Sequence, residues 1–280
     1  MINFGARGHD VTWATTPEQL AQGLAGYGVH NVQLALPKSF PAWSGAEAVN
    51  PGMGMHFRRV MAEHGVDIAV MGCYFNMTHP DPAEREAGLR RFEAYLANAR
   101  FFGAPVVASE TGSVFPGPGQ FTERNFTEEM YQEALASIRR LVAAGERFGT
   151  IVGVEPGANH PIHDIETTLR LLNDVDSPYL GIVLDPTACT TPNGLTCDGS
   201  DQVTFTRHAF DAFGDRMVAV HIDDFTTDAS GIHRCNVDDG TMDVAGILRI
   251  VAERRPLVPV ILEQTTDEAI ARAVQRYGNL

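Results

Sequence analysis

The chain has 280 residues, of which 44% are hydrophobic and 20% are charged, and its formal net charge is −14. This composition is typical of a globular protein that can bury a sizeable core. The acidic excess repels nucleic-acid phosphates, and Lys38 is the only lysine in the sequence, so no basic patch is visible. We therefore expect no nucleic-acid partner.

The sequence also lacks the signals of a membrane or secreted protein. No apolar stretch approaches the ~20 residues that span a bilayer. The opening residues, MINFGARGHD, contain neither a basic leader nor an apolar segment. We expect no membrane partner, no secretory signal and a cytoplasmic location.

Short apolar runs alternate with helical patterns along the whole chain. Strands are expected at residues 2–5, 31–36, 66–73, 105–109, 151–154, 180–184, 217–222 and 258–262. Helices are expected at residues 16–27, 53–64, 81–102, 128–148, 165–175, 203–213, 244–254 and 267–277. The stretches 37–51, 111–127 and 190–199 are rich in Gly and Pro and are expected to form loops.

This order of elements favours one architecture. The expected strands are apolar throughout rather than alternating, as in a parallel sheet that is covered by helices. Eight strand-then-helix units without a break in composition predict an α/β protein with a single (β/α)8 TIM-barrel domain over residues 1–280. An open, doubly wound sheet is the alternative, but no GxGxxG motif follows the first strand.

Four expected strands end in a residue that can bind a metal. Glu155 follows IVGV, Asp185 follows GIVL, His221 follows VAV and Glu263 follows VIL. Taken singly, such residues are also typical of helix caps, ion pairs or turns. In a (β/α)8 barrel, however, consecutive strands present their carboxyl ends to the same mouth. Three carboxylates and one imidazole without cysteine suit one divalent metal ion: Mn²⁺, Mg²⁺, Co²⁺ or Zn²⁺.

The motifs around these four residues resemble one family. EPG at Glu155, LDP at Asp185, VHIDDF at His221 and ILEQ at Glu263 are similar to the xylose isomerase-like barrels called sugar phosphate isomerases/epimerases. GCYFN at residues 72–76 and SETGS at residues 109–113 extend the resemblance over the chain. The family includes ketose 3-epimerases, ribulose-phosphate 3-epimerases, hydroxypyruvate isomerase and inosose dehydratase. These activities share the motifs, so the resemblance implies the fold and the metal site rather than the sugar.

The resemblance implies a metal-dependent isomerase or epimerase of a ketose or a ketose-like sugar. The four residues would bind the ion, which stabilises an enediolate as a Lewis acid. Glu155 and Glu263 would be the pair that removes a proton from carbon and returns it. Relatives are often homodimers or homotetramers, so such an assembly is possible here.

Two positions depart from the family pattern. Ala188 stands where ketose epimerases commonly carry a histidine, and Asp223 stands where many relatives carry a lysine. Because Lys38 is the only lysine and the expected mouth is acidic, a phosphorylated substrate is less favoured. Arg7 and Arg234 lie in positions from which an arginine could bind phosphate, but we interpret them as solvated surface charges.

Other polar residues follow the expected strands and are candidates for binding sugar hydroxyls. They are His9, Asn76, His79, Glu110, His160 and His163. Each is equally typical of a loop cap. Aromatic residues such as Tyr74 could supply an apolar wall, although packing is the commoner role.

Three other functions remain open at this point. A metal-dependent dehydratase of the inosose or keto-sugar type would use the same enediolate to expel a hydroxyl. An abasic-site endonuclease needs several zinc ions and a basic groove, against which the net charge of −14 argues. A non-catalytic sugar-binding barrel would keep the fold without the chemistry.

Overall fold

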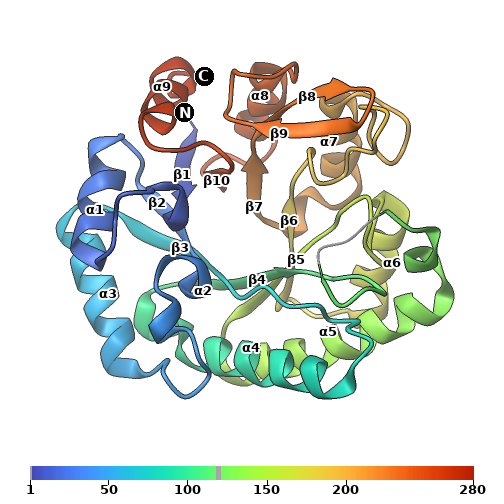
Figure 1. Cartoon of the computed structure of the whole chain (residues 1–280), viewed down its shortest axis with the longest axis horizontal. Coiled ribbons are helices and arrows are strands. Elements are labelled where there is room, and N and C mark those ends of the chain that lie inside the picture. The colour runs from blue at the N-terminus through green and yellow to red at the C-terminus, as the bar shows by residue number, and fades with distance from the viewer. Residues whose placement is uncertain (1, 118–120) are drawn as a thin grey trace.

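The computed structural model describes residues 2–117 and 121–280, and it confirms the predicted barrel. Parallel strands close into a ring in the order β1-β10-β7-β6-β5-β4-β3-β2, with the helices around the outside (Figure 1). The barrel strands are β1 (Asn3–Arg7), β2 (Asn31–Leu34), β3 (Asp67–Gly72), β4 (Val106–Glu110), β5 (Ile151–Glu155), β6 (Leu180–Leu184), β7 (Met217–Ile222) and β10 (Pro259–Leu262).

The long helices lie close to where the sequence places them. They are α1 (Pro17–Gly26), α3 (Pro51–Glu63), α4 (Pro82–Phe102), α5 (Glu128–Phe148), α6 (Ile165–Val175), α7 (Gln202–Phe213), α8 (Val244–Arg254) and α9 (Glu268–Tyr277). Local signals explain their bounds. The Thr16 side chain accepts a hydrogen bond from Gln19 N at the start of α1. Gly103 and Gly149 end α4 and α5 with φ of 77° and 73°, which glycine adopts without strain.

Two regions differ from the sequence-based expectation. The stretch 37–51 is not wholly a loop, because it includes most of the short helix α2 (Leu36–Ser39) and the 3₁₀ helix η2 (Pro41–Trp43). An unpredicted antiparallel hairpin, β8 (Asp224–Asp228) and β9 (Gly231–Cys235), follows β7. The other 3₁₀ helices are η1 (Gly8–Asp10), η3 (Glu123–Phe126) and η4 (Gly214–Arg216). Part of the loop expected at 111–127, residues 118–120, lies outside the described residues.

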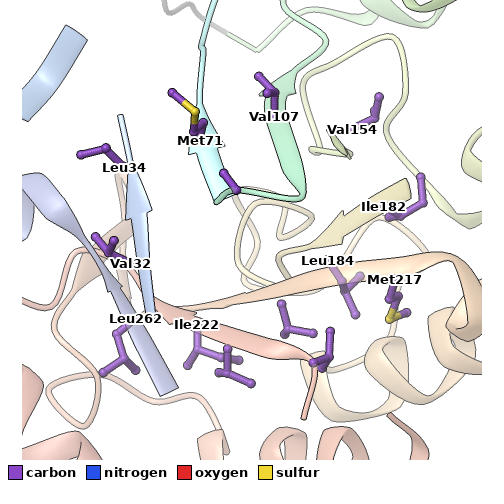
Figure 2. Close-up of a cluster of buried hydrophobic side chains, with 14 of the residues drawn as sticks. Val32, Leu34, Met71, Val107, Val154, Ile182, Leu184, Met217, Ile222 and Leu262 are labelled. Atoms are coloured by element: carbon purple, nitrogen blue, oxygen red, sulfur yellow. The ribbon is translucent and has the colours of Figure 1, made fainter. Parts of the chain in front are cut away.

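The main hydrophobic core lies between the barrel and its surrounding helices. Figure 2 shows side chains of this core from successive barrel strands, including Val32, Met71, Val154, Ile182 and Leu262. Because side chains alternate along a strand, the neighbouring residues of each strand face the barrel interior. Smaller apolar side chains fill that interior, among them Ala108, Val183 and Ala219.

The two-stranded hairpin is the main addition at the carboxyl end of the barrel strands, and Figure 1 shows it beside α7 and α8. Asp224, the first residue of β8, holds the chain that returns from the hairpin. Its carboxylate accepts hydrogen bonds from the backbone N–H groups of Phe225, Gly240 and Met242, at 2.8, 3.1 and 2.9 Å.

No helix among the described residues is long and apolar enough to cross a membrane.

Candidate metal centre and catalytic cavity

Alternation along the strands places the four candidate ligands inside the barrel mouth. Val183 and Ala219 belong to the interior cluster, and Asp185 and His221 lie two residues further along the same chain segments. Glu155 ends β5, and Glu263 directly follows β10. Strands β10, β7, β6 and β5 are neighbours in the barrel, so these side chains converge.

The four residues form one compact, buried cluster. Glu155, Asp185, His221 and Glu263 each offer one ligand atom, and these atoms all lie within 4.8 Å of one another. None of the four is more than 5% exposed. His221 Nδ1 lies 3.3 Å from Glu155 Oε1 and 3.2 Å from Glu263 Oε1. Three carboxylates in such a space require a compensating positive charge.

The imidazole of His221 is held in an orientation that could bind a metal. Its Nε2 lies 2.8 Å from Gln33 Oε1, an atom that can only accept a hydrogen bond. Its Nδ1 is buried and has no hydrogen-bond partner among residues 2–117 and 121–280. A neutral ring that donates from Nε2 therefore directs the Nδ1 lone pair toward the carboxylates.

The residues present therefore fit one divalent ion. One imidazole nitrogen and three carboxylate oxygens are a donor set that Mn²⁺, Mg²⁺, Co²⁺ and Zn²⁺ accept. Asp185 is also held in place, since its Oδ1 accepts hydrogen bonds from the backbone N–H of Thr187 at 2.7 Å and of Ala188 at 3.0 Å. Such outer contacts are typical of metal ligands.

Burial and crowding shift the titration of the cluster. Burial raises the pKa of Glu155 to about 7, although His221 beside it acts in the opposite direction. Burial lowers the pKa of His221, but the charges of Glu263 and Glu155 outweigh it and raise that pKa to about 9. The cluster without an ion therefore retains protons, which a bound cation would displace.

The interpretation of Arg7 and Arg234 as solvated surface charges is wrong. The Arg7 side chain is only 12% exposed, binds Asp10 through Nε at 2.8 Å and approaches Glu263 Oε2 at 3.5 Å. Arg234 reaches into the site from β9, with Nη2 2.8 Å from Asp185 Oδ2 and Nε 3.2 Å from Asp223 Oδ2. Both arginines therefore partly neutralise the buried acids.

A cavity of about 470 Å³ gives access to the cluster. Glu155 and Glu263 line it together with Tyr74, Arg7, Arg234 and Lys38. Of the candidates for substrate binding, His9 and Glu110 also line this cavity. Burial and the positive charges of Arg7 and Lys38 lower the pKa of His9 to about 4, so its ring is neutral at pH 7.

The other candidates do not line the cavity that gives access to the cluster. Asn76 and His160 line an adjoining cavity of about 450 Å³. The amide of Asn76 donates to Ser113 O and Phe115 O at 2.7 and 2.8 Å, and so it also holds the loop after β4.

His79 and His163 line neither of these two cavities. His79 Nδ1 accepts a hydrogen bond from Asp81 N at 3.1 Å, beside the start of α4. The His163 ring packs on Phe126 at 4.2 Å between centroids. Their contacts are those of loop residues.

Sequence reasoning missed one residue of the site entirely. Gln33 sits inside the apolar run of β2, is fully buried and contacts both His221 and Glu263. A buried glutamine in an apolar strand was the available signal, because its polar atoms require partners.

A family model for the xylose isomerase-like TIM barrel matches residues 22–278. The chain belongs to this family. Comparison with curated proteins found no sequence that matches it.

Solved structures of similar fold have low sequence identity to this family member. The 3-keto-D-glucoside 4-epimerase of E. coli in its apo form has a TM-score of 0.75, with 15% identity and coverage of 100% of both chains. The probable 3-DHS dehydratase of Bacillus anthracis has a TM-score of 0.71 and 14% identity, over 98% of this chain and 99% of the other. A xylose isomerase-like barrel protein of Mycobacterium smegmatis in complex with magnesium has a TM-score of 0.69 and 15% identity, over 93% and 86%.

A longer neighbour is a fusion of such a barrel with a 4-hydroxyphenylpyruvate dioxygenase. It has a TM-score of 0.69 and 18% identity, and the match covers 94% of this chain but only 38% of the fusion protein. At these identities the neighbours show the shared fold alone. The chemistry must be argued from the residues of this chain.

Proposed function

We propose that the protein is a divalent-metal-dependent isomerase or epimerase of a ketose or a ketose-like sugar. The observation that carries the proposal is the cluster of Glu155, Asp185, His221 and Glu263, whose ligand atoms lie within 4.8 Å of one another. In the part of the chain that the structure describes, His221 Nδ1 has no hydrogen-bond partner. A divalent ion bound by these atoms would polarise a substrate carbonyl and acidify the neighbouring C–H group.

The positions of the two glutamates support a role in moving that proton. Both line the cavity, and both contact His221 Nδ1. In the barrel, Glu155 at the end of β5 and Glu263 after β10 lie on opposite sides of β7, which carries His221. Proton transfer at carbon needs a carboxylate that accepts the proton and a group that returns one. A proton returned to the opposite face of the same carbon gives an epimer, and one returned to the adjacent carbon gives an isomer.

The surroundings of the two carboxylates differ. Glu263 Oε2 lies 3.5 Å from Arg7 Nη1 and 3.6 Å from Arg234 Nη1, so two cations face this carboxylate. Glu155 has no arginine contact of this kind among the described residues, and burial raises its pKa to about 7. Unequal environments of this type suit one carboxylate to accept a proton and the other to donate one.

The proposal is tested by carbon–proton exchange. Metal-loaded protein is incubated in D₂O with a panel of ketoses, and NMR follows deuterium incorporation and new stereoisomers. We expect incorporation next to the carbonyl, together with an epimer or an aldose. Glu155→Gln and Glu263→Gln should each lower the exchange rate by about 10²–10⁴-fold, the usual contribution of an acid/base group.

Glu166→Gln is the matched control, because Glu166 lies on the exposed surface of α6 and should leave exchange unchanged. Loss of water with a new enone absorbance would instead assign the dehydratase reaction. Full exchange in both catalytic-site variants would overturn the proposed acid/base pair.

A further inference from the structure

A line of hydrogen bonds runs from His221 to the wall of the cavity. His221 Nε2 lies 2.8 Å from Gln33 Oε1, and Gln33 Nε2 donates to the Tyr74 hydroxyl oxygen at 2.6 Å. Tyr74 lines the cavity of Glu155 and Glu263 as well as the adjoining cavity. The tyrosine hydroxyl is thus linked through one glutamine to a candidate metal ligand.

The direction of these hydrogen bonds is determined by chemistry at two independent points. Gln33 Nε2 also donates to Glu263 Oε1 at 3.3 Å, where the carboxylate oxygen is the acceptor. The amide nitrogen of Gln33 must therefore face Glu263 and Tyr74, and its oxygen must face His221. The same orientation follows from His221, whose Nε2 donates when Nδ1 is directed at the carboxylates.

This polarity decides what the Tyr74 hydroxyl can do. An amide nitrogen cannot accept a hydrogen bond, so the Tyr74 oxygen is the acceptor in this pair. The hydroxyl hydrogen of Tyr74 is therefore not used in the bond with Gln33. Within residues 2–117 and 121–280, no acceptor for that hydrogen is found. Burial and the nearby carboxylates raise the pKa of Tyr74 well above its ordinary value, so the hydroxyl keeps its proton.

We propose that Tyr74 is a substrate-binding residue that donates its hydroxyl hydrogen to an oxygen of the bound sugar, in an orientation imposed by Gln33. The inference rests on the proposed function, because that function supplies the sugar oxygen. It goes further in assigning a hydrogen-bond donor for the substrate on the wall of the cavity that Glu155 and Glu263 line. It also requires a substrate that presents an oxygen acceptor to Tyr74.

The test combines Tyr74→Phe with substrates that each lack one hydroxyl group. The parent substrate is the ketose that the wild-type protein exchanges fastest in D₂O. We expect kcat/KM for the parent to fall about 10- to 100-fold in Tyr74→Phe, as for loss of a buried hydrogen bond. One deoxy derivative should be a poor substrate of the wild type, and Tyr74→Phe should remove that discrimination.

Two further measurements separate this role from a merely structural one. Tyr131→Phe is the matched control, because the Tyr131 hydroxyl bonds to Asp174 at 2.6 Å and lines neither cavity. It should leave kcat/KM unchanged. Affinity for Mn²⁺ should be the same in Tyr74→Phe and in the wild type, since Tyr74 is not among the candidate ligands.

A measurement of ligand binding makes the test independent of catalytic turnover. Calorimetry measures the binding of D-glucitol and D-mannitol, which are reduced ketohexoses that cannot react, to metal-loaded protein. Tyr74→Phe should weaken the binding of at least one of them fivefold or more. Absence of exchange with every ketose would defeat the proposed function alone. The role of Tyr74 would be overturned if the two proteins bound the hexitols with equal affinity, or if neither bound them. It would also be overturned if Tyr74→Phe still discriminated between the parent substrate and the deoxy derivative as the wild type does.

Discussion

Single residues explain why the buried acids of the mouth can coexist. Gln33 fixes the ring of His221, and Arg234 lies between Asp185 and Asp223, two carboxylates that are fully buried. Burial, and then repulsion from Asp185, raise the pKa of Asp223 to about 8, even though Arg234 acts in the opposite direction. Asp223 is thus a buried group that contacts Arg234 beside Asp185, rather than a surface acid.

Gln33→Met should weaken metal binding without removing a metal ligand. The variant leaves His221 Nε2 without its acceptor, so the ring no longer favours the tautomer with a free Nδ1. Loss of such an outer contact typically costs about 10- to 100-fold in metal affinity. Calorimetric titration with Mn²⁺ measures the effect. An affinity equal to that of the wild type would show that Gln33 does not control His221.

The four candidate ligands could be predicted from the sequence, whereas their supporting residues could not. Glu155 and Asp185 could be predicted from their positions at strand ends, because the carboxyl ends of all strands of a parallel barrel lie at the same mouth. Gln33 and His221 are 188 positions apart, and no local pattern reports a contact over that separation. The burial of Arg234 could not be predicted, because this residue lies on a hairpin that the sequence pattern does not reveal.

At the scale of elements, burial decides which segments the sequence reveals. The barrel strands are apolar because helices cover them, and their pattern is readable. The hairpin of β8 and β9 has an exposed, polar tip with the sequence TTDASG, which resembles a loop. Its position is set by contacts to the barrel mouth, such as that of Arg234 with Asp185, which only the folded chain brings together.

Close packing of α3 against α4 gives a prediction for Gly54. A Cβ atom there would lie 2.7 Å from Phe101 Cβ and 2.9 Å from the backbone carbonyl carbon of Phe101. Gly54→Ala should therefore destabilise the protein by about 1–3 kcal/mol, as overpacking does. Thermal unfolding measures it, at about 2–4 °C per kcal/mol for a chain of roughly this size.

Gly26→Ala is the control for this substitution. Gly26 is the last residue of α1, and a Cβ atom there would meet no heavy atom of the described residues within 4 Å. The change should be neutral or stabilise by up to about 1 kcal/mol, because alanine favours the helix. Equal effects of the two substitutions would show that α3 and α4 are not packed as described.

At the scale of the whole molecule, the net charge of −14 and the buried acids both make the electrostatic potential more negative. Both favour the capture of a cation at the mouth of the barrel, where Glu155, Asp185 and Glu263 converge on His221. The barrel contributes rigidity, since each ligand comes from or directly follows a different strand of one closed sheet. Metal binding should in turn stabilise the folded chain, because the unfolded chain has no assembled site.

The most direct measurement is a calorimetric titration of the metal-free protein with Mn²⁺. The account predicts about one ion per chain, with affinity lowered at least tenfold in Asp185→Asn and unchanged in Asp211→Asn, whose carboxylate is on the surface beside Arg254. Absence of binding by the wild-type protein, or equal affinity in Asp185→Asn, would contradict a metal centre built from Glu155, Asp185, His221 and Glu263.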